Sequence, residues 1–171
     1  MATMRLPKMS TVKPPDKQPA KNNTAEFHNR LRQKFSQKSP NLVWVSDLTY
    51  IRVAGRWHYL CVIIDLFSRK VVAWEVSEMA NSKLVENTFI KAYKARGEPE
   101  GLMFHSDRGC QYTSESFRRL LDKLNVVQSF SKKGYPFDNA VAESFFKYLK
   151  QEETNRRKYR TITELRISLF E

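Results

Sequence analysis

The chain has 171 residues, of which 41% are hydrophobic and 12% aromatic, enough to build the core of one domain of ordinary size. Its formal net charge of +12 makes nucleic acid the first candidate partner, because clustered lysines and arginines release counterions from a phosphate backbone. The charge by itself is also compatible with binding to an acidic lipid surface. No stretch approaches the roughly 18 apolar residues of a membrane span, and the two cysteines and three histidines lack zinc-ligand spacing, so we expect a cytoplasmic protein with neither a membrane span nor a zinc site.

The first forty residues carry more than half of the net charge. They contain nine lysines or arginines against two acidic residues, a net +7. Four prolines and few large apolar side chains predict a disordered basic tail at 1–25, either a phosphate-contacting arm or a solubilising leader. Residues 26–40 are interpreted as a basic lead-in, residues 41–157 as the core domain, and residues 158–171 as the start of a truncated C-terminal helix.

Three strands are expected at the start of the core, at 42–53, 56–67 and 71–77. The first is apolar on both faces, as a central strand is. Ala54-Gly55 supplies a tight turn into the second strand, and residues 68–70 supply another into the third. The three strands are therefore predicted to form an antiparallel meander.

Helices and strands alternate in the rest of the chain. The pattern predicts a helix from Asn81 to about Lys94, a strand at 102–107, a helix at 114–124, a strand at 126–131, a long helix from Asp138 or Asn139 to about Glu153, and a helix opened by a capping box at Thr161 and Glu164. This order predicts an α/β fold in which a mixed sheet carries helices on both faces. Right-handed crossovers place the fourth and fifth strands parallel to the first.

Two aspartates stand in or at the end of predicted strands. Asp47 lies in mid-strand, where an uncompensated carboxylate is costly to bury. Asp107 ends the fourth strand, at the carboxyl edge where open α/β sheets bind ligands. Because the fourth strand should run beside the first, the two aspartates are expected close together. His105 is interpreted as a packed histidine, and Asp65 as a residue that anchors a loop.

A third acid, Glu143, lies in the first turns of the last long helix. Three carboxylates brought together repel one another unless divalent cations hold them, and oxygen ligands suit Mg²⁺ or Mn²⁺. Two such ions about 4 Å apart are a known device for displacement at a phosphodiester. Each acid also fits a structural role alone, as a core aspartate, a strand-end residue or a partner of Lys147 in a surface ion pair.

Basic and aromatic side chains near these acids are candidates for DNA contacts. Lys147 and Lys150 share the helix face of Glu143 and are predicted to contact phosphate. Tyr112 is the one aromatic candidate for base stacking, since the three tryptophans are interpreted as core or strand-pair residues. The further DNA-binding candidates are Arg108, Lys132 and Lys133.

Three sequence blocks carry a resemblance to a known family. They are "VWVSDLTYI" with Asp47, "HSDRGCQYTS" with Asp107 and "FDNAVAESFFKYLKQE" with Glu143. With 35 residues between Asp107 and Glu143, they resemble the signature blocks of DDE transposases of the IS-three insertion-sequence family, relatives of retroviral integrases. The resemblance spans about residues 30–171 and implies an RNase H-like fold with a five-stranded sheet in the order 3-2-1-4-5.

The resemblance also implies an activity. It implies a polynucleotidyl transferase or endonuclease that hydrolyses DNA at transposon ends and carries out strand transfer by the resulting 3′-hydroxyl, with Asp47, Asp107 and Glu143 binding two Mg²⁺ or Mn²⁺ ions. The implied partners are double-stranded DNA and further copies of the chain, in a bacterial cytoplasm. Two alternatives stay open: a metal nuclease of this fold without strand transfer, and a truncated, non-catalytic DNA-binding remnant.

Overall fold

A five-stranded mixed sheet forms the centre of the protein in the computed structural model, which describes residues 27–170. The predicted tail at 1–25 lies outside the described residues. The strands are β1 (Val43–Val53), β2 (Arg56–Asp65), β3 (Val71–Ser77), β4 (Met103–Ser106) and β5 (Val127–Phe130). Their order is β3-β2-β1-β4-β5, with β1 to β3 antiparallel and β4 and β5 parallel to β1. The predicted sheet and its order 3-2-1-4-5 are confirmed.

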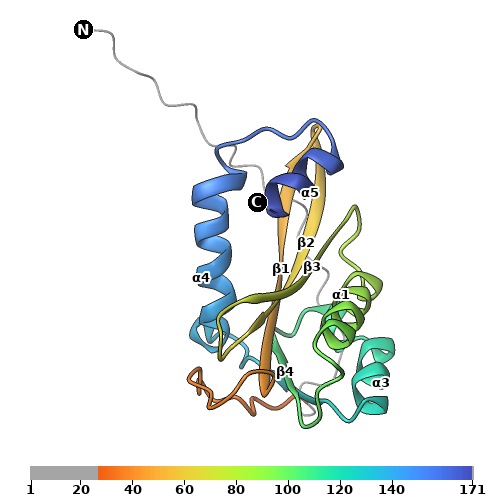
Figure 1. Ribbon diagram of the computed structural model, residues 1–171, viewed down its shortest axis with the longest axis vertical. Coiled ribbons are helices and arrows are strands. Elements are labelled where there is room, and N and C mark those ends of the chain that lie inside the picture. The colour runs from red at the N-terminus through yellow and green to blue at the C-terminus, as the bar shows by residue number, and fades with distance from the viewer. Residues whose placement is uncertain (1–26, 171) are drawn as a thin grey trace, which may run out of the picture.

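Helices cover both faces of the sheet. They are α1 (Ser82–Ala95), α2 (Cys110–Thr113), α3 (Glu115–Lys123), the 3-10 turn η2 (Pro136–Asn139), α4 (Ala140–Leu149), the π-helical turn η3 (Lys150–Thr154) and α5 (Ile162–Phe170). Helices α1 and α3 lie on one side of the strands and α4 on the other (Figure 1). The predicted helices at 81–94 and 114–124 are confirmed, whereas α2 was not expected. Within residues 27–170, no helix combines the length and apolar character needed to cross a membrane.

Strand β1 is buried on both faces along most of its length, as its continuous apolar sequence predicts. Trp44 and Leu48 contribute to the core cluster that α1 and α3 also line. Val45 and Ile51 point the other way and contribute to the cluster lined by α4 and α5. The backbone that carries Asp47 is therefore fixed from both sides.

Two of the predicted turns and caps have the expected geometry. The turn between β1 and β2 places both Ala54 and Gly55 at positive φ, 47° and 80°, as a two-residue hairpin turn requires. The Asn81 side chain accepts a hydrogen bond from the Leu84 N–H at 3.1 Å and so caps α1. Thr161 accepts one from the Glu164 N–H at 3.1 Å at the start of α5.

The start of α4 differs from the prediction. Neither Asp138 nor Asn139 caps the helix with its side chain. The Asp138 carboxylate accepts hydrogen bonds from residues elsewhere in the fold, and the Asn139 amide donates to the Ser46 carbonyl at 3.2 Å. Long-range partners therefore take the groups that a local cap would have used. The α-helix ends at Leu149 and continues as η3 rather than reaching Glu153 unchanged.

The described part of the lead-in, residues 27–40, packs against the core domain. The Phe27 ring lies 4.7 Å from that of Phe130 in β5, centroid to centroid. The Phe130 N–H donates to the His28 carbonyl at 2.9 Å, so the lead-in covers part of the outer edge of β5. Leu31 is buried in the core cluster beside α4.

Candidate active site

The register of β1 and β4 brings two of the three predicted acids to one edge of the sheet. The strands are parallel, and Val45 lies opposite His105. Two residues further along each chain come Asp47, still in β1, and Asp107, the first residue after β4. The shared register therefore carries both carboxylates to matching positions at the carboxyl end of β4.

The loop after β4 orients Asp107 through a close backbone approach. Its Oδ1 accepts a hydrogen bond from the Gly109 N–H at 2.9 Å. A Cβ atom on Gly109 would lie 3.0 Å from that oxygen and 2.8 Å from Gln111 Oε1. Any larger residue at position 109 would force the Asp107 carboxylate or the Gln111 amide to move.

A group of neutral polar side chains lies on the face of β1 opposite to that of Asp47. The Tyr112 hydroxyl is 2.8 Å from Ser46 Oγ, next to Asp47 in the chain, and Ser46 Oγ is 3.7 Å from Cys61 Sγ. Burial raises the pKa of Tyr112 well above its usual value, and the negative charges of Asp47 and Asp107 raise it further. Burial likewise raises the pKa of the Cys61 thiol to about 11. Both groups therefore stay protonated at neutral pH.

The burial of Tyr112 shows that its predicted role in base stacking is wrong. The side chain is 0% exposed. Its ring packs against Phe104 and Phe117, at centroid distances of 6.2 Å from each. The short helix α2 turns the ring inward, so it has no free face for a base.

Glu143 lies on the solvent-exposed part of α4. The protein around it partly desolvates its carboxyl and raises the pKa of that group. Within residues 27–170, no three histidine, cysteine, aspartate or glutamate side chains lie close enough to hold one metal ion together. The register places Asp47 and Asp107 at matching positions, and the three predicted acids do not form one three-ligand cluster in this part of the chain.

Lys150 and Lys147 differ in their surroundings. Lys147 is exposed on α4, whereas Lys150, at the start of η3, has its ammonium 4.5 Å from the centroid of the Tyr50 ring. Desolvation lowers the pKa of Lys150, and the negative charge of Asp47 opposes that shift. This coupling indicates that the Lys150 ammonium lies near the aspartate edge.

The donor atoms near this edge fit a hard divalent cation. The carboxylates of Asp47, Asp107 and Glu143 are oxygen donors of the type that Mg²⁺ and Mn²⁺ prefer. Asn139 Oδ1 is buried, has no hydrogen-bond partner among the described residues, and belongs to a side chain already bonded to β1 beside Asp47. It adds a further oxygen acceptor to the same region.

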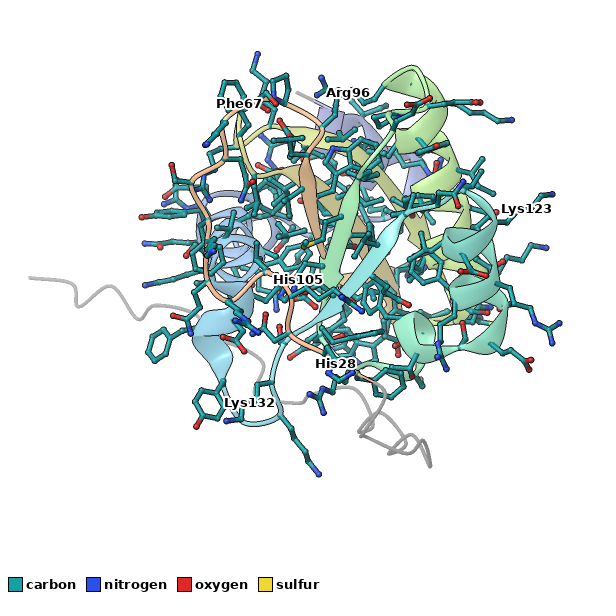
Figure 2. The ribbon with its side chains drawn as sticks, turned by 90° about the horizontal axis from the view of Figure 1, so that it is seen from below. His28, Phe67, Arg96, His105, Lys123 and Lys132 are labelled. Atoms are coloured by element: carbon teal, nitrogen blue, oxygen red, sulfur yellow. The ribbon has the colours of Figure 1, made fainter. Side chains whose placement is uncertain are left out.

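The other predicted DNA contacts lie near the loop between β5 and α4. Arg108 donates from Nε to the Ser131 carbonyl at 2.9 Å and from Nη2 to the Phe27 carbonyl at 3.0 Å, so its guanidinium connects this loop to the lead-in. Lys132 and Lys133 are exposed, and the Lys132 ammonium lies 4.4 Å from the centroid of the Tyr135 ring, in the loop labelled in Figure 2. The structure thus gives Arg108 a structural role that the sequence did not indicate.

Two further side chains occupy the roles that the sequence predicts. His105 is buried and packed, with both ring nitrogens in hydrogen bonds. Asp65 accepts hydrogen bonds from the Asn41 N–H, the Ser68 N–H and the Ser68 hydroxyl, and so anchors two loops at the end of β2. Asp138 and Asn139 are long-range connectors that the sequence does not indicate, because their place before a helix is equally typical of a cap.

Comparisons with known proteins agree with this architecture. The integrase core domain family matches residues 37–136. The chain is 40% identical over 142 residues to the transposase of insertion sequence element IS904 from Lactococcus lactis subsp. lactis, covering 83% of this chain and 56% of that protein. It is also 40% identical over 124 residues to the transposase InsF of IS3A from Escherichia coli K12, covering 72% of this chain and 43% of that protein. The chain spans about half the length of these curated relatives.

Solved structures share the fold at low sequence identity. The catalytic domain of the Mos1 mariner transposase superposes with a TM-score of 0.64 at 18% identity, covering 76% of this chain and 68% of that chain. The HTLV-2 integrase catalytic core domain gives a TM-score of 0.55 at 21% identity, covering 66% and 69%. The predicted RNase H-like fold is confirmed. The chain belongs to the integrase core domain family and, within it, to the DDE transposases of the IS3 family.

Proposed function

We propose that this chain is the catalytic core of a transposase and acts on DNA as a polynucleotidyl transferase. It cleaves a DNA strand at the end of a mobile element and joins the resulting 3′-hydroxyl to target DNA. One observation carries the proposal: the β1–β4 register brings Asp47 and Asp107 to one sheet edge in a chain of the integrase core domain family. The two curated relatives described above are both named transposases.

In this proposal Asp47, Asp107 and Glu143 hold two Mg²⁺ or Mn²⁺ ions. When bound, the ions would activate the attacking water or hydroxyl and stabilise negative charge on the phosphoryl oxygens. The HTLV-2 integrase core was solved in complex with magnesium and the Mos1 catalytic domain with Mn, which supports this choice of ions. Glu143 would complete this set of ligands from α4.

The chain's own basic groups would bind the DNA backbone beside the carboxylates. Lys150 supplies a positive charge near Asp47, and the Tyr50 ring limits the positions that its ammonium adopts. Lys147, Lys132 and Lys133 are exposed and would contact further phosphates of the backbone.

The proposed partners are double-stranded DNA and other copies of this chain. The net charge of +12 favours a polyanion. The HTLV-2 core was solved in a dimeric form, and another protein of this fold, with a TM-score of 0.63 at 19% identity and covering 84% of this chain and 50% of that chain, was solved in a simian T-cell lymphotropic virus intasome. We therefore expect the chain to act as a homo-oligomer on DNA.

A plasmid assay tests the proposed chemistry. The purified chain is incubated with supercoiled plasmid and a duplex oligonucleotide that carries a free 3′-hydroxyl, with Mn²⁺ or with chelator. We expect nicking and joined product in Mn²⁺, and a loss of at least 100-fold in Asp107→Asn and Glu143→Gln. Asp122→Asn, which neutralises an exposed acid on α3, is the control and should keep activity. Equal activity in wild type and Asp107→Asn would sink the proposal.

Among residues 27–170 the three acids do not form one three-ligand cluster, which favours one rival, a non-catalytic DNA-binding remnant. That rival predicts salt-sensitive plasmid binding without nicking, and binding that Asp107→Asn leaves unchanged. A third outcome, nicking without joined product, would identify a metal nuclease instead of a transferase.

A further inference from the structure

The Asp138 carboxylate, at the end of η2, is a buried acceptor for three donors. The residue is 3% exposed. Its two oxygens accept hydrogen bonds from Asn29 Nδ2, Gln33 Nε2 and the Lys132 N–H, each at 2.8 Å. Burial by itself raises the pKa of Asp138, but these hydrogen bonds outweigh it and the pKa falls below its usual value. A charged carboxylate therefore connects the lead-in to the loop before α4.

The lead-in presents its amide donors in a fixed orientation. Asn29 Oδ1 accepts a hydrogen bond from the Arg32 N–H at 2.8 Å, so the Nδ2 group of the same amide must face Asp138. Arg32 and Gln33 both take positive φ angles, 49° and 59°, which turn the lead-in back toward this carboxylate. The backbone conformation of the lead-in therefore directs both amide side chains toward Asp138.

A second connection passes through His105, two residues before Asp107. Ser129 Oγ accepts hydrogen bonds from the backbone N–H groups of Arg30 and Leu31 at 2.9 and 3.1 Å. The Ser129 hydroxyl therefore donates its proton to His105 Nδ1, which lies 2.8 Å from Ser129 Oγ. His105 Nε2 therefore carries the ring proton and donates to the Asp138 carbonyl at 3.0 Å. Figure 2 shows His105 in the interior, between the strands and the loop that carries Lys132.

A third connection reaches the strand that carries Asp47. Asn139 follows Asp138 and donates from Nδ2 to the carbonyl of Ser46, the residue before Asp47. Helix α4 begins at the next residue, and Glu143 lies one turn further along it. Asp138 and Asn139 thus join the lead-in, β4 and β1 at the point where the helix bearing Glu143 starts.

We propose that the lead-in, through Asn29 and Gln33, acts on Asp138 to position α4 and so sets where Glu143 stands relative to Asp47 and Asp107. Asn29, Gln33, Asp138 and His105 are positioning residues, because none of them touches the reacting atoms. The inference rests on the proposed function, since it assigns Glu143 to the same metal site. It adds that metal affinity depends on a segment outside the three signature blocks.

An exchange of the buried pair tests this positioning in the full chain. Asn29→Asp places two carboxylates face to face, and Asp138→Asn removes the charge that Asn29 and Gln33 bind. In the double variant the hydrogen bond between positions 29 and 138 reverses direction, because the amide introduced at position 138 would donate to the carboxylate introduced at position 29, which still accepts from the Arg32 N–H. The Lys132 N–H loses its acceptor in this arrangement, whereas Gln33 keeps its acceptor oxygen. We expect each single variant to bind Mn²⁺ about 10-fold more weakly than wild type and the double variant to recover part of that loss.

Two readouts separate positioning from general loss of structure. Free Mn²⁺ is measured by electron paramagnetic resonance, and amide hydrogen exchange is measured without metal for residues 140–146. Each single variant should exchange faster in that segment, with protection of β1 and β2 unchanged. Gln33→Met, at an exposed position, should weaken Mn²⁺ binding in the same direction. Gln37→Met is the matched control, since that amide donates to the Lys34 carbonyl within the lead-in.

The two proposals fail in different ways. Unchanged exchange at 140–146 in Asp138→Asn and Gln33→Met would overturn the positioning role, whatever the metal result. A double variant that regains exchange protection but not Mn²⁺ affinity would also overturn it. A wild-type chain that binds no Mn²⁺ would count against the proposed function, and the exchange data would still decide whether the lead-in positions α4.

Discussion

The buried imidazole of His105 makes the stability of this domain depend on pH. Burial lowers the pKa of His105 from 6.5 to about 4, although the carbonyl and charge of Asp138 and the charge of Asp107 oppose the shift. As pH falls below 6.5, His105 becomes protonated in the unfolded chain but stays neutral in the native state, so the free energy of unfolding decreases. Between pH 6.5 and 5 the loss is about 2 kcal/mol, at about 1.4 kcal/mol per pH unit. It is complete near pH 4.

Urea unfolding followed by tryptophan fluorescence measures this loss at pH 7 and pH 5. Wild type should lose about 2 kcal/mol between these values, a large fraction of the roughly 5–15 kcal/mol that holds a typical domain folded. His105→Gln should start less stable at pH 7, since it breaks the bonds to Ser129 and Asp138, but should show a smaller dependence on pH. His28→Gln is the control and should keep the wild-type slope. An equal change in the free energy of unfolding between pH 7 and pH 5 in wild type and His105→Gln would refute the reasoning.

Three further substitutions test contacts around the aspartate edge. Tyr112→Phe removes a buried hydrogen bond to β1 and should lower the free energy of unfolding by about 1 kcal/mol in urea titrations, and no change would mean that the hydroxyl bond contributes nothing. Gly109→Ala should weaken Mn²⁺ binding about 10-fold by displacing the Asp107 carboxylate, and wild-type affinity would show that the loop adapts. Tyr50→Leu removes the ring beside the Lys150 ammonium and should weaken DNA binding by about 0.5–1 kcal/mol in fluorescence anisotropy, an effect that should vanish in a Lys150→Ala background.

The sheet and its two aspartates could be predicted because they depend on local patterns. The continuous apolar run of β1 predicts a strand buried on both faces, and the crossover rule then places β4 beside it. Asp47 and Asp107 come to one edge as a direct result of that parallel register. The positions of the two aspartates therefore follow from strand order alone, without knowledge of any contact between distant side chains.

The misses concern side chains whose partners lie far away in the sequence. Asp138 has the residue type and position of a helix cap, and only the folded lead-in supplies the Asn29 and Gln33 donors that take its oxygens. Tyr112 stands in a segment that reads as a loop, and the four residues of α2 turn its ring into the core. Arg108 beside Asp107 suggests a phosphate contact, yet two backbone carbonyls bind its guanidinium.

The packing of the lead-in bears on how a minimal domain should be cut. Composition changes at Asn41, and a fragment that starts there would still hold every strand and all three acids. It would lose the buried side chains of Phe27 and Leu31, each worth roughly 1.5–3 kcal/mol of burial. It would also leave the outer N–H of Phe130 open for another chain to pair with. Such a fragment should aggregate through β5, so a soluble fragment for metal or DNA studies has to begin before Phe27.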